Sequence, residues 1–345
     1  MAAAVGLIAN PAAGRDIRRL TAHASVVPNH EKASIVRRVL HGLAATGVDL
    51  VLYLADTAGI VAAAVDGARP PVAMEALGLR AHGWASDSTE AARLLAAAGV
   101  GAIVTLGGDG TNRAVAAACG EVPLVAVSTG TNNVFPTMVD GTVAGLAAGL
   151  VATGAVDAEQ VVRRAKRVEV QVEAAGDAAG GADFALIDAA ACTDAFVGTR
   201  AVWDAARVRA LVLTRAEPWS VGLSAIGGRL CPLAPEDPAG LYVELAPAGE
   251  GPAVTATVAP GVVASVAVSG WRLLELGEPV TLSGLGRGFD AGERRGGART
   301  VALDGERELA LDPNTVATAT VTLTGPRVVD IRAALAAAGR GWDRG

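Results

Sequence analysis

The chain has 345 residues, of which 51% are hydrophobic and 19% are charged. This length and composition are typical of a globular protein with two domains, each with its own core. The net charge of −6 argues against a general surface for nucleic acid or anionic membranes, because such surfaces need clusters of Lys and Arg. Aromatic residues make up only 3%, so the cores must be built from small aliphatic side chains.

Strand and helix patterns alternate from the N-terminus to about residue 160. The expected strands are residues 5–9, 49–54, 102–106 and 123–127, and the expected helices are residues 31–46, 87–95 and 112–119. Asp87, with Glu90 three residues later, predicts a capping box at the start of the second helix. This alternation predicts an α/β fold with a doubly wound, mostly parallel sheet, in which ligands bind at the carboxyl ends of the strands.

The pattern changes after the basic run 163–167. Strand-like segments then recur with few helical patterns between them, at 168–172, 241–245, 254–258, 262–268, 299–303 and 316–323. This half is expected to form a β-rich antiparallel sandwich, followed by a last helix over 328–338. The predicted organisation is an α/β domain over 1–162, a β-sandwich domain over 163–326, and a C-terminal helical segment over 327–345 that packs back on the first domain.

Cysteine usage and hydropathy bear on the location of the protein. Cys119, Cys192 and Cys231 lie far apart and form no CxxC pair, which fits neither a disulfide framework nor a structural zinc site. The N-terminus has no basic segment of the kind that begins a secretory signal, so the expected location is a reducing cytoplasm. The uncharged window 251–271 contains a Pro-Gly turn between two alternating segments, which predicts two strands rather than a membrane span.

The run 107–111, with the sequence Gly-Gly-Asp-Gly-Thr, follows one predicted strand directly and precedes a predicted helix. A strand, a glycine turn and a helix start place backbone N–H groups and the positive end of a helix dipole around one point, where anions bind. A carboxylate at that point should repel phosphates unless a divalent metal lies between them or the acid has a proton to collect. The loop therefore predicts a phosphate site with a catalytic carboxylate at Asp109.

A second polar loop, residues 128–135, follows the predicted strand 123–127. Its hydroxyls and amides either donate to phosphate or ribose oxygens or form a polar turn that caps the next helix. Because the strand before it neighbours the strand before Asp109, the two loops are expected to form one site.

Two further motifs are weak on their own. Asn10-Pro11 begins a glycine loop that reaches Gly14, and a plain turn explains it. Asp304-Gly305, in the β-rich half, is typical of a hairpin turn.

Together these motifs resemble the superfamily that unites NAD kinases with diacylglycerol and sphingosine kinases. Its hallmark is the GGDGT loop, which residues 107–111 match. The lipid-kinase branch also has an Asn-Pro-x-x-Gly loop, a GTxND-type loop and a late Asp-Gly-Glu, which are similar to residues 10–14, 129–133 and 304–306. The opening segment 8–25 resembles the AcoX branch of the ATP-NAD kinase family, which is found beside acetoin-catabolism genes.

The resemblance implies a nucleotide-binding α/β domain and a β-sandwich domain with the active site between them. It implies ATP as phosphoryl donor, Mg²⁺ as the metal that bridges its phosphates, and Asp109 as general base. The nucleotide-binding residues that it implies are Asn10, Gly14, Gly107, Gly108, Gly110, Thr111, Asn112, Thr129, Thr131, Asn132 and Asn133. The candidates in the second domain are Asp188, Asp194, Asp304 and Glu306.

Departures from the family pattern concern the phosphate acceptor. NAD kinases carry an Asn-Glu pair on a strand after the domain switch, where this chain offers the acid Asp188 without the amide. Their later Thr-Gly-Ser-Thr-Ala-Tyr loop has no counterpart, and Asn132-Asn133 stands where the lipid branch has Asn-Asp.

The expected function is an ATP-dependent kinase with the 2′-hydroxyl of NAD or NADH as its first acceptor. The alternatives are a kinase for another small alcohol or a lipid, and a nucleotide-binding regulator with little turnover. Few aromatic residues and no basic patch count against a membrane lipid. The expected partners are a nucleotide, a small-molecule acceptor and further copies of the chain, with neither nucleic acid nor membrane.

Overall fold

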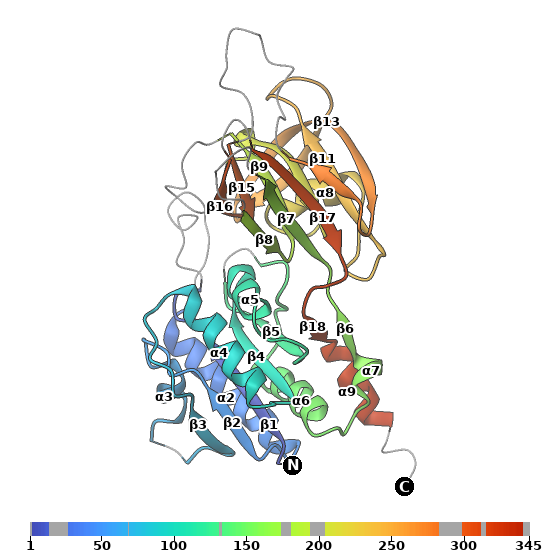
Figure 1. The fold of residues 1–345 in the computed structure, drawn as a ribbon. Helices are drawn as coiled ribbons and strands as arrows, with labels where there is room; N and C mark the ends of the chain where they lie inside the picture. Colours follow the sequence, from blue (N-terminus) through green and yellow to red (C-terminus); the bar gives the residue numbers. More distant parts are fainter. Residues whose placement is uncertain are drawn as a thin grey trace. The chain divides into compact units, whose positions relative to one another are not determined.

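The computed structural model describes residues 2–13, 27–67, 69–130, 133–173, 181–193, 204–282, 299–311 and 315–340. These residues form two compact units, whose elements are labelled in Figure 1. Unit 1 contains the described residues up to Arg164 and those after Gly325, and unit 2 contains the described residues between these two positions.

Unit 1 is built on a seven-stranded sheet. Its strands are β1 (Ala4–Ala9), β2 (Leu50–Tyr53), β3 (Ala73–Ala76), β4 (Ala102–Gly107), β5 (Leu124–Ser128), β6 (Val162–Arg164) and β18 (Arg327–Val329). They lie in the order β3-β2-β1-β4-β5-β18-β6, and every pair is parallel except β18 with β6. The predicted parallel sheet is confirmed, and β3, β6 and β18 extend it beyond the predicted strands.

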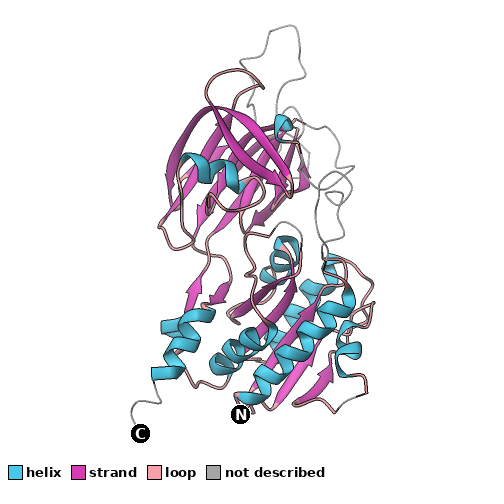
Figure 2. Cartoon of the chain, turned by 180° about the vertical axis from the view of Figure 1, so that it is seen from behind, coloured by secondary structure: helices cyan, strands magenta, loops and turns pink. Residues whose placement is uncertain are grey.

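Helices cover both faces of this sheet (Figure 2). They are α2 (Asn29–Ala45), α3 (Ile60–Val65), α4 (Ala85–Ala97), α5 (Asp109–Ala116), α6 (Gly141–Ala152), α7 (Ala158–Val161) and α9 (Ile331–Arg340). Successive strand residues point to opposite faces, so Leu7 packs in the core of α2, α3, α6 and α9 whereas Ile8 packs in the core of α4 and α5. This arrangement confirms the doubly wound α/β fold.

The predicted starts of α4 and of the last helix differ from the observed ones. Helix α4 begins at Ala85 with Trp84 as its N-cap, so Asp87 is the third residue of the helix and accepts from the backbone N–H of the N-cap instead of being the N-cap itself. The Asp87 Oδ2 accepts hydrogen bonds from the backbone N–H groups of His82, Gly83 and Trp84 at 2.8, 2.6 and 3.1 Å, which ties the preceding turn to the helix. The last helix begins at Ile331, because the residues before it pair in the sheet as β18.

Unit 2 is a β-sandwich. Its elements are β7 (Arg167–Glu173), β8 (Gly181–Ala185), β9 (Asp188–Cys192), β10 (Val208–Leu213), α8 (Ser224–Leu230), β11 (Ala239–Leu245), β12 (Ala253–Ala259), β13 (Val262–Glu275), β14 (Pro279–Thr281), β15 (Thr300–Leu303), β16 (Glu306–Ala310) and β17 (Val316–Thr322). A seven-stranded sheet, β12-β13-β11-β10-β9-β15-β16, packs on a four-stranded sheet, β14-β17-β7-β8. Their shared core takes alternate residues such as Val168 and Val170 of β7 and Ala189 and Ala191 of β9.

The predicted antiparallel sandwich is therefore confirmed. The uncharged window 251–271 forms β12 and most of β13, which pair antiparallel as expected. Among the described residues, no helix combines the length and apolar character that crossing a bilayer requires.

The cysteines provide a simple check of this packing. None of the three is in a disulfide; Cys119 and Cys192 are buried, and Cys231 is half-buried. Burial raises the pKa of the Cys119 thiol to about 11. Since the thiolate is the reactive form, we expect iodoacetamide at mildly alkaline pH to modify Cys231 first in the native protein. Peptide mass spectrometry measures this, and native Cys119 reacting as fast as in the unfolded chain would contradict the packing.

Candidate functional site

Three loops of unit 1 begin side by side, at the carboxyl ends of β1, β4 and β5. The chain runs outward from β1 through β2 and β3 and returns to β4 on the other side of β1, which makes this edge a topological switch point. The N–H of Asn10 donates to the carbonyl of Leu106 at 3.0 Å, and the N–H of Thr129 donates to the carbonyl of Gly107 at 3.1 Å. The loops are thus joined where they leave the sheet.

The glycine motif forms the first turn of α5. This helix begins at Asp109, not at Asn112 as predicted, and Gly108 is its N-cap. A Cβ on Gly107 would lie 2.4 Å from the Thr111 side chain, and a Cβ on Gly108 would lie 2.8 Å from Asn133 Oδ1. Gly107 therefore needs to be glycine for close approach, whereas a side chain at Gly108 would displace the Asn133 amide. The first N–H groups of a helix have no acceptor within it and carry partial positive charge, so this turn is suited to an anion.

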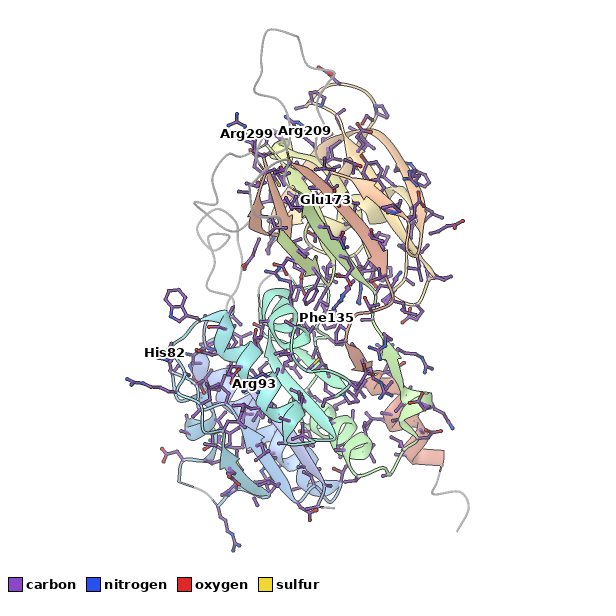
Figure 3. The ribbon with its side chains drawn as sticks, in the orientation of Figure 1. His82, Arg93, Phe135, Glu173, Arg209 and Arg299 are labelled. Carbon is purple, nitrogen blue, oxygen red and sulfur yellow. The ribbon has the colours of Figure 1, made fainter. Side chains whose placement is uncertain are left out.

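The Asp109 carboxylate is fixed by the loop after β5. Its Oδ1 accepts from the N–H of Phe135 at 2.8 Å and from that of Val134 at 3.1 Å, and its Oδ2 lies 3.2 Å from the same Val134 nitrogen. Phe135 is labelled in Figure 3, next to α5. Asp109 itself is only 8% exposed. These bonds hold a carboxylate in one place at the start of the helix.

Asn10 connects the first loop to this turn. Its Nδ2 donates to Thr111 Oγ1 at 2.8 Å, and its Oδ1 accepts from the N–H of Ala12 at 2.8 Å. The Asn-Pro motif is therefore more than a plain turn, because its side chain orients a hydroxyl of the glycine motif.

The Asn112 side chain lies inside the protein. It is fully buried: Thr105 Oγ1 donates to its Oδ1 at 2.6 Å, and its Nδ2 donates to the carbonyl of Gly108 at 2.9 Å. Both ends of the amide are engaged inside the protein, while the contact of Asn112 with a nucleotide stays a prediction. The side chain supports the turn from within.

The loop after β5 contributes two more predicted residues. Asn133 Nδ2 donates to Ser128 Oγ at 2.7 Å, and its Oδ1 faces the α-carbons of Gly108 and Gly130. The Thr129 hydroxyl is buried without a hydrogen-bond partner among the described residues. Gly14, Thr131 and Asn132 lie outside the described residues.

One further residue of the site, the buried Lys32, was not among the predicted site residues. Its ammonium donates to the carbonyls of Asn10, Pro11 and Ala13 at 2.9, 3.3 and 3.1 Å. Lys32 belongs to α2 and lies one helical turn before Val36, on the apolar face of the helix. A lysine in register with an apolar stripe was the signal that could have found it.

In unit 2, the structure brings Asp188 and Asp304 together, and Glu306 begins strand β16 just after them. Asp304 and Gly305 form the turn of the β15–β16 hairpin with φ of 52° and 75°, as predicted. Asp304 Oδ1 accepts from the N–H of Ile187 at 2.7 Å, and Asp188 Oδ1 accepts from the N–H of Gly305 at 3.2 Å.

The two carboxylates therefore cross-link the hairpin to the start of β9. Asp188 is 6% exposed and Asp304 is 7% exposed, so both are buried in this cross-link. Asp194 lies outside the described residues. Within the described ranges, no group of three or more His, Cys, Asp or Glu side chains is placed to hold a metal ion.

Comparisons with known proteins agree with this fold. Residues 5–155 match the model of the ATP-NAD kinase N-terminal domain, and residues 166–324 match that of the acetoin catabolism protein X C-terminal domain. Acetoin catabolism protein X of Cupriavidus necator is 39% identical over 352 residues, which cover 99% of this chain and 93% of that protein. The structure of yeast NADH kinase complexed with NADH aligns with a TM-score of 0.53 at 13% identity, over 99% of this chain and 88% of that one, and shows a shared fold.

The relative matches almost the whole chain, and the two family models match its two halves in order. The chain therefore belongs to the acetoin catabolism protein X family and, through its N-terminal domain, to the NAD kinase superfamily.

Proposed function

We propose that this protein is an ATP-dependent kinase that transfers a phosphoryl group to a hydroxyl, with the 2′-hydroxyl of NAD or NADH as its first acceptor. The observation that carries the proposal is the Asp109 carboxylate, fixed by main-chain amides at the start of α5 where three loops meet. A helix start binds phosphates, and a carboxylate beside it receives a proton from an attacking hydroxyl.

The residues around Asp109 suit phosphate binding. Thr111 Oγ1 accepts a hydrogen bond from Asn10, so the hydroxyl hydrogen of Thr111 is the donor toward a ligand. Backbone N–H groups of the first turn of α5 add donors and a partial positive charge. Phosphoryl transfer depends mainly on positioning and charge neutralisation, which these fixed groups supply without reorganisation.

Asp109 acts as general base in this proposal. Its carboxylate takes the proton of the acceptor hydroxyl, which contributes about 100-fold or more to the rate. The amides of Val134 and Phe135 hold the carboxylate in position, and the helix dipole partly offsets its repulsion of phosphates.

The donor set also suits Mg²⁺, which the family implies. Mg²⁺ is usually held by one or two carboxylates together with substrate phosphates and water. Asp109 provides a carboxylate at the start of α5. When bound, the ion neutralises charge on the phosphates.

Two observations bear on the acceptor. The fold shared with yeast NADH kinase supports a nicotinamide dinucleotide. The cross-link in unit 2 favours a second candidate, a kinase for another small alcohol. NAD kinases carry an acid at the position of Asp188. In this chain the Asp188 carboxylate accepts a hydrogen bond from the N–H of Gly305, so it is engaged within unit 2.

An acceptor panel tests the proposal. The purified chain is given ATP and Mg²⁺ with NAD, NADH, a short diol or diacylglycerol in micelles, and ADP release and the phosphorylated product are measured. We expect NAD or NADH to stimulate ADP release and to yield NADP or NADPH. Turnover with the diol alone would replace the first acceptor by the second candidate. Tight ATP binding with no acceptor-dependent turnover would contradict a kinase and favour a nucleotide-binding regulator.

A further inference from the structure

A fully buried ammonium lies under the Asn10 loop. Lys32 has no exposed surface, and its Nζ donates to the carbonyls of Asn10, Pro11 and Ala13 at 2.9, 3.3 and 3.1 Å. Burying a charge is costly unless its hydrogen-bonding groups are satisfied, and an ammonium has three donors. Three carbonyls of one short loop contribute to meeting that requirement, so the loop is shaped around the lysine.

This arrangement changes the electrostatics of the loop. Carbonyl oxygens carry partial negative charge and repel phosphates. The carbonyls of residues 10, 11 and 13 point at the ammonium, so their negative ends are turned toward Lys32. The positive charge of Lys32 lies behind the same loop, where low polarisability strengthens its effect on a nearby anion.

The loop held by Lys32 is part of the site. Besides its carbonyl, which contacts Lys32, Asn10 uses its Nδ2 to orient the Thr111 hydroxyl at 2.8 Å and its N–H to bond the carbonyl of Leu106 at 3.0 Å. One residue thus connects the ammonium to the first turn of α5.

We propose that Lys32 is a positioning residue that sets the affinity of this site for the polyphosphate part of the nucleotide. It acts by turning the loop carbonyls away from the ligand and by placing a positive charge behind the loop. The inference rests on the proposed function for the identity of the ligand.

Lys166 provides a matched control within the chain. It is 3% exposed, and its Nζ donates to the carbonyls of Ala234, Asp237 and Ala239 at 3.3, 2.7 and 2.8 Å. Lys166 holds a loop in the same way, but the lysine and the three carbonyls that it contacts all belong to unit 2. The Lys166→Met variant therefore measures how much the melting temperature and the ligand affinities change when a buried lysine that holds a loop is removed from unit 2.

The experiment compares Lys32→Met with Lys166→Met in the full chain. Binding of ATP, AMP and inorganic triphosphate is measured by calorimetry, and the melting temperature is recorded. We expect Lys32→Met to weaken ATP and triphosphate about 10-fold or more and AMP much less. Lys166→Met should leave all three affinities unchanged while lowering the melting temperature. A second variant, Lys32→Gln, keeps hydrogen-bond donors without the charge and should show the same preferential loss for triphosphate.

Two results would overturn the inference. One is a folded Lys32→Met or Lys32→Gln protein that binds ATP as tightly as the wild type. The other is an equal loss for ATP and AMP, which indicates general damage to the loop. Lysine-dependent ATP binding without turnover of any acceptor would overturn the kinase proposal and leave this inference standing. A wild-type protein that binds neither ATP nor triphosphate would overturn both.

Discussion

Replacement of Asp109 by Asn is expected to lower acceptor-dependent turnover by about 100-fold or more, because an amide cannot take the proton of the attacking hydroxyl. The Asn Oδ1 can still accept from the N–H groups of Val134 and Phe135, so the position of the side chain is retained. ATP binding measured without Mg²⁺ should therefore remain close to that of the wild type. Steady-state ADP release with the best acceptor measures the turnover, and calorimetry measures the binding.

Asp140→Asn is the matched control for this substitution. Asp140 caps α6 by accepting from the N–H of Thr142 at 2.8 Å, and Asn caps helices about as well as Asp. The control should keep both turnover and stability. Full turnover of Asp109→Asn would rule out a base at this position. An equal loss of ATP binding and turnover would assign Asp109 a role in holding the site rather than in moving a proton.

The sequence predicted the architecture well where the patterns are long and local. Every residue of β4 is buried, which matches the continuous apolar run expected of a central parallel strand. Along β7, buried residues alternate with more exposed ones, as expected of a sandwich strand with one face on the core. Both patterns are local, because the strand period is determined by the strand's own residues.

Short strands with distant partners could not be predicted. β6 and β18 have three residues each, too few for a periodic pattern. They pair Arg164 with Arg327, so the strands form only when the two ends of the β-sandwich segment are brought together. Their formation is a consequence of tertiary structure rather than of local preference.

The candidate site was predicted from residue types, but the structure shows that some of the predicted polar side chains are buried and hydrogen-bonded inside the protein. Asp109, Thr111 and Asn10 lie together as the motifs suggested. The Asn112 side chain has an amide that could hydrogen-bond a ligand, yet its Oδ1 accepts from the Thr105 hydroxyl inside the protein. A motif identifies which side chains are polar, but only the folded backbone decides which way each one points.

Gly145→Ala is expected to lower the stability of unit 1, because α2 and α6 pack with their backbones in contact. A Cβ on Gly145 would lie 2.2 Å from the carbonyl oxygen of Val39, and a Cβ on Gly42 would lie 2.3 Å from that of Thr142. Backbone atoms cannot rotate away, so the two helices would have to separate. Overpacking of this kind costs about 1–3 kcal/mol or more, which exceeds the gain of about 1 kcal/mol in helix propensity.

Hydrogen exchange of the α2 and α6 amides measures this effect, since it reports the free energy of local opening. A net loss of about 2 kcal/mol corresponds to exchange roughly 30-fold faster. Gly339→Ala is the matched control: it lies in α9, and a Cβ there would meet no atom within 4 Å. That variant should gain up to about 1 kcal/mol in helix propensity and leave α2 and α6 unchanged. If Gly145→Ala slowed exchange as a plain gain in propensity would, α2 and α6 could not be packed backbone to backbone.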